Sequence, residues 1–182
     1  KNTIVLFASD NGSHFDVASN EIAMETARNQ PFAVDTASLS GPVHYPNAPL
    51  RGTKRTVWEG GVRTPLIARW PDHFPEEAVS SELFALNDVL ATLAVLVDYE
   101  LPSNSAQDSY NLLPVLEGKS ENIRESLVVK ASKKLYGLRK GQWKFIQGEK
   151  NQSPQLYDLS VDIAETDNLY ASNPKMAKEL EQ

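Results

Sequence analysis

Asp10 and Asn11 are the first residues of this chain whose side chains could bind a metal ion. They stand together at the end of an apolar run, Thr3 to Ala8, and Gly12 follows them. Carboxylate and amide oxygens are the ligands that Ca²⁺ and Mg²⁺ prefer, but a calcium shell needs about 6 to 8 oxygens. The same Asp-Asn-Gly step could equally form a plain turn. The pattern therefore predicts either a turn or part of a cation site that takes further carboxylates from elsewhere.

Lys54 is the second candidate, because glycines surround it. Gly52 precedes it and Trp58-Glu59-Gly60-Gly61 follows, so the backbone could pass close to a ligand while the ammonium contacts an oxyanion. A lone lysine in a loop is more often plain solvated surface. His14 and His44 lie near these two loops and could contact a substrate or transfer protons, although most loop histidines do neither.

The apolar run before Asp10 predicts a strand that positions these side chains. Both of its period-2 faces are apolar, which is typical of a central strand in a parallel sheet covered on both sides. Such sheets carry their chemistry at the carboxyl ends of the strands, where Asp10 and Asn11 stand. The sequence offers one other plausible partner strand, Thr64 to Trp70. We therefore expect the rest of the sheet to be encoded upstream, which would leave an apolar face of Ile4 to Ala8 uncovered in the isolated chain.

The middle of the chain predicts two helices and a long loop. Residues 20–29 favour a helix, and residues 32–49 form an irregular stretch marked by glycine and proline. A second helix is expected from Leu83 to Val97 with a buried apolar stripe, and Ser80 or Ser81 could cap it.

The pattern changes near residues 98–119, where a border is expected. Short period-2 runs follow at 127–131, 134–139, 142–147 and 154–159, with Lys140-Gly141 as a hairpin turn. Asn173-Pro174 then begins a last helix over residues 175–181. We therefore expect an α/β domain over residues 1–118 and a small C-terminal subdomain, an antiparallel sheet with a helix, over residues 119–182.

Composition excludes several classes of function. The chain has 182 residues, 41% of them hydrophobic and 23% charged, as in an ordinary globular protein. The net charge is −6 and the basic residues are scattered, which argues against a nucleic-acid partner. No apolar run approaches the roughly 18 residues of a membrane span. The lack of cysteine excludes disulfides, thiolate metal sites and a cysteine nucleophile within these residues.

Several segments together resemble the second half of the type I, formylglycine-dependent sulfatases (arylsulfatases). The resemblance covers nearly the whole chain in order, and the combination is far more specific than any single piece. The segments are Thr3–Gly12, Asn47–Lys54, Trp58–Pro71, Asp108–Gly118, Leu138–Ile146, Leu156–Leu159 and Asp162–Leu169.

The resemblance implies an alkaline-phosphatase-like α/β sandwich with one Ca²⁺ ion per active site beside a formylglycine hydrate that attacks sulfate-ester sulfur. By similarity, Asp10 and Asn11 are two of the metal ligands and Lys54 contacts the sulfate. The family's formylglycine motif, Cys or Ser followed by x-Pro-x-Arg, is not found here, nor is its pair of adjacent aspartates. The resemblance assigns both to a missing N-terminal half. This chain alone would then be inactive and prone to self-association, and a periplasmic or extracellular location is favoured.

Three functions stay open at this point. The chain could be the C-terminal portion of a sulfatase that hydrolyses sulfate esters of a sugar or an aryl alcohol. It could instead be a non-catalytic carbohydrate-binding or interaction remnant of the fold, or part of a related phosphodiesterase or phosphonate hydrolase. The joint presence of Asp10, Asn11 and Lys54 favours the first, and the Lys54 loop disfavours the third.

Overall fold

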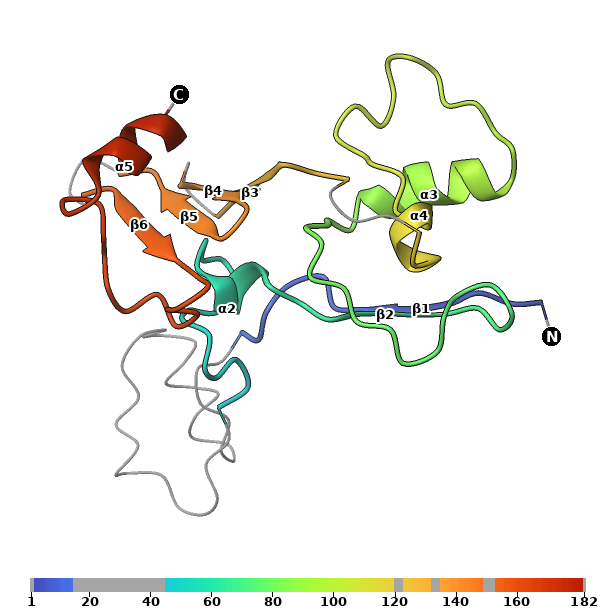
Figure 1. Cartoon of the computed structure of the whole chain (residues 1–182), viewed down its shortest axis with the longest axis horizontal. Helices are drawn as coiled ribbons and strands as arrows, with labels where there is room; N and C mark the ends of the chain where they lie inside the picture. The colour runs from blue at the N-terminus through green and yellow to red at the C-terminus, as the bar shows by residue number, and fades with distance from the viewer. Residues whose placement is uncertain (1, 15–44, 120–122, 132–134, 149–152, 182) are drawn as a thin grey trace. The chain divides into compact units, whose positions relative to one another are not determined.

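The computed structural model describes residues 2–14, 45–119, 123–131, 135–148 and 153–181 (Figure 1). The chain divides into two compact units, one made of Lys1–Asp10 with Pro65–Leu127 and the other of Asn11–Thr64 with Val128–Gln182. The helix expected at residues 20–29 lies outside the described residues. The expected border at residue 118 concerns domains of the whole protein and stays a prediction. No helix of the described part is long and apolar enough to cross a membrane.

The first unit contains a two-stranded sheet whose strands are antiparallel, whereas parallel strands were expected. Strand β1 (Val5–Ala8) pairs with β2 (Leu66–Arg69) in antiparallel register, so that Val5 faces Arg69 and Ala8 faces Leu66. The prediction of a parallel neighbour was therefore wrong for this partner. Apolar periodicity reports which faces of a strand avoid water, but it does not report the direction of the neighbouring strand.

Strand β1 is exposed in this chain. All four of its residues are exposed, and the side chains of Val5 and Phe7 reach 53% and 61% exposure. Ile67 on β2 is 59% exposed. Within the described residues, no element covers both faces of β1. The expectation that the isolated chain leaves an apolar face of this strand uncovered is met.

Helix α3 (Asp88–Leu96) begins later than predicted. Its N-cap is Asn87, and neither Ser80 nor Ser81 caps it; Ser80 Oγ instead accepts a hydrogen bond from the Glu82 N–H. The Asp88 carboxylate turns back to accept the Ala85 N–H at 2.6 Å, which holds the preceding residues in a turn. The predicted apolar stripe is only partly buried, because Leu90 is 52% exposed whereas Ala94 is buried.

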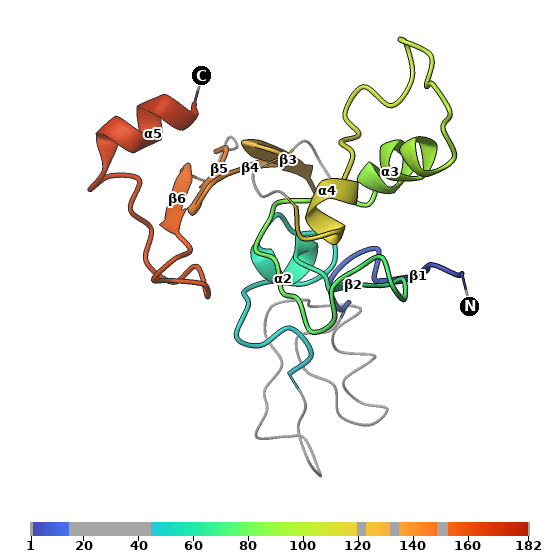
Figure 2. The same cartoon turned by 45° about the vertical axis from the view of Figure 1, so that its right-hand side comes forward.

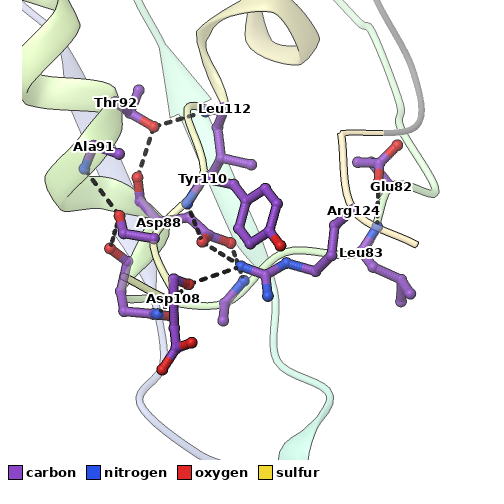
Figure 3. A network of polar contacts seen from close by, with 12 residues as sticks. Glu82, Leu83, Asp88, Ala91, Thr92, Asp108, Tyr110, Leu112 and Arg124 are labelled. Carbon is purple, nitrogen blue, oxygen red and sulfur yellow. Dashed lines mark hydrogen bonds and ion pairs between the residues drawn. The ribbon is translucent and has the colours of Figure 1, made fainter. Parts of the chain in front are cut away.

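A buried ion pair between Asp88 and Arg124 fixes α3 within the first unit (Figure 3). The Asp88 carboxylate also accepts the Tyr110 N–H at 2.9 Å, and the Arg124 guanidinium lies 4.2 Å from the centre of the Tyr110 ring. Thr92 Oγ1 donates to the Asp88 carbonyl and accepts the Leu112 N–H. These contacts tie α3 to the residues that lead into the short helix α4 (Leu113–Leu116).

The C-terminal part has the predicted architecture of an antiparallel meander with a helix. The four-stranded sheet has the order β3-β4-β5-β6, and β5 pairs in antiparallel register with β4 and β6. The predicted hairpin turn lies at Gly141, whose φ of +54° suits glycine. The strands are β3 (Ser126–Lys130), β4 (Tyr136–Lys140), β5 (Trp143–Ile146) and β6 (Gln155–Asp158).

Helix α5 (Pro174–Leu180) packs on this sheet (Figures 1 and 2). Its start was predicted correctly, because the Asn173 side chain accepts the Met176 N–H and Pro174 occupies the first turn. Ala177 and Leu180 form an apolar cluster with Phe145 and Leu156. The α/β class with a small C-terminal antiparallel sheet and helix is thus confirmed.

Candidate active site

Two segments that the sequence singled out are hydrogen-bonded to each other in the second unit. The Gly12 N–H donates to the Gly61 carbonyl at 3.0 Å, and the Lys54 N–H donates to the Ser13 carbonyl at 2.8 Å. Because Asn11 and Lys54 belong to these segments, the fold brings the predicted metal-ligating amide into the neighbourhood of the predicted anion-binding lysine loop.

Asn47 joins the same two segments with its side chain. Its Oδ1 accepts the Ser13 N–H at 2.9 Å, and its Nδ2 donates to the Gly52 carbonyl at 2.9 Å. The sequence reasoning placed Asn47 in a family-like segment but gave it no role. The signal that could have found it is an amide beside the Pro-Leu-Arg-Gly turn, since asparagine can satisfy an N–H and a carbonyl at once.

The glycines of both segments allow the backbones to touch. A Cβ on Gly12 would lie 1.7 Å from the Gly60 carbonyl oxygen, and one on Gly60 would lie 2.3 Å from the Gly52 carbonyl oxygen. Neither distance leaves room for a methyl group, so the close approach requires glycine at both positions. The glycines predicted to let the backbone pass near a ligand serve first to bring backbone against backbone.

The Lys54 loop rests on the C-terminal sheet through a buried apolar residue and a buried ion pair. Val57 is wholly buried and packs with Ile146 and Tyr157. Glu59 begins the short helix α2 (Glu59–Val62), and its Oε1 lies 2.7 Å from Lys144 Nζ. Its Oε2 lies 3.4 Å from Arg139 Nη1, and burial lowers the pKa of Arg139 while the Glu59 carboxylate opposes that shift.

Glu165 supports the loop from a second direction. Its Oε2 accepts the Glu59 N–H at 2.7 Å, and its backbone carbonyl accepts from Arg51 Nη1 at 2.9 Å. Glu165 is fully buried, and burial raises its pKa to about 7 although the Lys144 ammonium opposes the shift. Its Oε1 has no hydrogen-bond partner in the part of the chain that the structure describes.

Arg51 has a structural role in this region. Its Nη1 also donates to the Tyr157 hydroxyl at 3.1 Å, and its guanidinium lies 4.3 Å from the centre of the Trp58 ring. Trp58 Nε1 and the Tyr157 hydroxyl both donate to Gln155 Oε1. Arg51 thus packs between the lysine loop and strand β6.

The predicted site residues are placed as follows. Asp10 is exposed and follows the end of β1, and Asn11 is half-buried with its Nδ2 donating to the Gly12 carbonyl at 3.0 Å. Lys54 and His14 are half-buried, whereas His44 lies outside the described residues. The oxygens of Asp10 and Asn11 suit a hard cation. Among the described residues no group of three or more His, Cys, Asp or Glu could complete its shell.

Comparisons with known proteins agree with this reading of the segments. The family described as Sulfatase matches residues 1–99, and the family described as N-sulphoglucosamine sulphohydrolase, C-terminal, matches residues 52–182. An N-acetylgalactosamine-6-O-sulfatase of Bacteroides thetaiotaomicron is 33% identical over 195 residues, covering 100% of this chain and 35% of that protein. Human arylsulfatase A is 31% identical over 210 residues, covering 99% of this chain and 36% of that protein.

A solved structure shows the same fold. This structure comes from work on the metabolism of multiple glycosaminoglycans by Bacteroides thetaiotaomicron. It superposes on this chain with a TM-score of 0.79 and 32% sequence identity, and the match covers 98% of this chain and 37% of the other. This chain therefore spans little more than a third of the length of these relatives. Since the two family matches together extend over residues 1–182, the chain belongs to the sulfatase family and corresponds to the C-terminal part of its members.

Proposed function

We propose that the protein hydrolyses sulfate esters and that this chain supplies part of the active site. The observation that carries the proposal is the pair of backbone hydrogen bonds, Gly12 to Gly61 and Lys54 to Ser13, which join the Asn11 segment to the lysine loop. These bonds join the segment that bears the proposed cation-binding amide to the loop that bears the proposed oxyanion-binding lysine, which supports a catalytic role over that of a remnant that only kept the fold.

Each residue has a defined part in the proposed reaction. Asp10 and Asn11 contribute two oxygen ligands to a Ca²⁺ ion. When bound, the ion and a formylglycine hydrate would supply a Lewis acid and a nucleophile for attack at sulfur. The Lys54 ammonium contacts the non-bridging sulfate oxygens and stabilises the negative charge that shifts as the ester bond breaks. His14 remains a candidate for a contact with the substrate, and so does His44.

We propose a sulfated sugar as the substrate class, with an aryl sulfate as a surrogate. Support comes from the name of the Bacteroides relative, an N-acetylgalactosamine-6-O-sulfatase that aligns over the entire chain. Human arylsulfatase A aligns nearly as far, so hydrolysis of an aryl sulfate serves as the first assay.

The test is hydrolysis of an aryl sulfate and of a panel of sulfated amino sugars by the full-length protein in the presence of Ca²⁺. Lys54→Ala should lower kcat/KM roughly 30- to 1,000-fold, because a contact to transition-state charge contributes about 2 to 4 kcal/mol. The matched control is Lys175→Ala, which removes an exposed lysine of α5 and should leave kcat/KM unchanged. The 182-residue chain by itself should show no turnover, since its sequence lacks the nucleophile motif.

The same assays separate the competing functions. Binding of sugar without hydrolysis by the full-length protein would favour a carbohydrate-binding role. Hydrolysis of phosphodiesters or phosphonates, with sulfate esters untouched, would favour the related hydrolases. Equal kcat/KM in Lys54→Ala and the wild type would contradict the role of Lys54.

A further inference from the structure

The loop that carries Lys54 is attached to the C-terminal sheet by polar contacts of buried residues in addition to the apolar contact of Val57. The Glu59 side chain binds Lys144 of β5, and the Glu59 N–H binds the Glu165 carboxylate. The Glu165 carbonyl in turn accepts from Arg51 at the start of the loop. The segment from Arg51 to Glu59 is therefore held at its two ends by Lys144 and Glu165, two residues of the C-terminal part of the chain.

The polar part of this attachment is costly in free energy, whereas an apolar contact such as that of Val57 holds the loop without burying charge. Charges buried without water lose several kcal/mol of hydration each, and replacing a buried pair by apolar residues is often neutral or stabilising. Glu165 also adopts a left-handed φ of +54° and leaves its Oε1 without a partner among the described residues. Costs of this kind persist where the surrounding structure needs one geometry.

A short path of hydrogen bonds leads from Glu165 to the candidate site. Glu165 holds the Glu59 N–H; the next N–H, that of Gly60, donates to the Arg51 carbonyl at 2.7 Å. The carbonyl of Gly61 then accepts the Gly12 N–H. A shift of α2 would therefore move the Asn11 segment and the lysine loop relative to each other.

We propose that Glu165 and Lys144 are positioning residues for sulfate-ester hydrolysis, which hold the loop at Arg51 and Glu59 so that Lys54 stays aligned with the Asn11 segment. The inference rests on the proposed function, since it assigns to the C-terminal sheet a part in the same reaction. It predicts that these residues act through Lys54 rather than on the substrate.

A double-mutant cycle in the full-length protein tests this coupling. Glu165→Ala and Lys144→Met should each lower kcat/KM by about 10-fold, within the range for residues coupled in one network. In a Lys54→Ala background the same substitutions should have little further effect, because the group that they position is gone. Glu165→Gln keeps an acceptor for the Glu59 N–H and should restore kcat/KM relative to Glu165→Ala.

The exposed pair Lys140–Glu179 gives the matched controls. Its Nζ and Oε1 lie 3.0 Å apart with side chains 45% and 51% exposed, on β4 and α5 of the same sheet-and-helix subdomain. Lys140→Met and Glu179→Ala should leave kcat/KM unchanged in both backgrounds. Should Glu165→Ala fail to fold, Lys144→Arg carries the cycle, because arginine keeps the positive charge but moves the donor that binds Glu59; Glu165→Gln then serves as the variant whose kcat/KM should stay near that of the wild type.

Hydrogen exchange gives a readout that does not need turnover. Amides of residues 51–61 should exchange faster in Glu165→Ala than in the wild type and in Glu179→Ala. Unchanged exchange would overturn the proposal whether or not the protein is a sulfatase. Faster exchange, combined with losses in kcat/KM that add to the loss caused by Lys54→Ala, would show that Glu165 has a structural role only. That result would also overturn the proposal. A wild-type protein with no sulfatase activity would overturn the proposed function and the positioning role together, whereas additive losses leave the function intact.

Discussion

Lys144 Nζ lies 2.7 Å from Glu59 Oε1, and the two side chains are only 1% and 7% exposed. Strand β5 and helix α2 are far apart in sequence, and this ion pair connects them. Glu59 follows the loop that carries Lys54, and the Arg139 guanidinium approaches the same carboxylate. The carboxylate of Glu59 is therefore the point where the loop and the C-terminal sheet are joined.

Removing the ammonium of this pair should destabilise the protein strongly. Lys144→Met leaves the buried Glu59 carboxylate with only the longer contacts to Arg139 and Arg63 among the described residues, at 3.4 and 3.6 Å, and breaking a buried pair in this way costs about 3 to 5 kcal/mol. The free energy of unfolding from denaturant titration measures the loss. Lys140→Met, which breaks the exposed pair with Glu179, should cost about 1 kcal/mol or less. Equal losses in the two variants would show that burial of the Lys144 pair has no energetic consequence.

Stability should depend on the protonation of Glu165. Its pKa rises from 4.5 to about 7 in the folded protein because of burial, against the opposing charges of Lys144 and Arg51, while the Glu59 carboxylate adds to the rise. Between these two pH values the folded state keeps a proton that the unfolded state has lost, so the free energy of unfolding falls as pH rises. The full change is on the order of 3 kcal/mol and is complete above about pH 7.

The substitution Glu165→Gln isolates this effect, because glutamine cannot ionise. We expect its free energy of unfolding to vary less than that of the wild type between pH 4.5 and 7, measured by denaturant titration at several pH values. Glu179→Gln, at an exposed carboxylate, should retain the wild-type slope. Parallel pH dependence in the wild type and Glu165→Gln would refute a raised pKa at this position.

The Asp88–Arg124 pair should be equally sensitive to loss of charge (Figure 3). Asp88→Asn keeps the shape of the side chain but leaves the Arg124 guanidinium, which is 6% exposed, without its counter-charge. We expect a loss of about 3 to 5 kcal/mol and faster hydrogen exchange in α3. Asp98→Asn is the matched control: Asp98 is exposed at the end of α3, and asparagine tolerates its φ of +57°. Similar exchange in the two variants would contradict the role of the pair.

The 182-residue chain should associate through strand β1. Val5, Phe7 and Ile67 expose apolar side chains on a sheet that has only the strands β1 and β2 among the described residues, and such surfaces and strand edges drive association. Phe7→Lys should lower the apparent mass in light scattering at a given concentration. Val161→Lys changes an exposed valine (84%) that belongs to the other unit and should leave the mass unchanged. A wild-type chain that stays monomeric over the whole concentration range would rule out this role of β1.

The sequence by itself determined the elements that local chemistry specifies. Gly141 marks the hairpin because few other residues adopt its φ of +54°, and Asn173-Pro174 marks the start of α5 because the amide caps the first turn. The sequence segments around Gly12, Gly52 and Gly60 were also part of the resemblance that identified the sulfatase family, and the family matches confirm that identification. The residues proposed for the metal and the sulfate, Asp10, Asn11 and Lys54, stay predictions.

Only the tertiary structure decided which residues meet over long separations. Hydrophobic periodicity could not give the antiparallel pairing of β1 with β2, because an apolar strand can pair in either direction. The late start of α3 depends on the Asp88 carboxylate, whose partner Arg124 lies beyond the next loop. Glu59, Lys144 and Glu165 each read as ordinary charged residues in sequence. They become buried partners only when α2 is packed on β5, and burial is what turns an ordinary charge into a costly and specific contact.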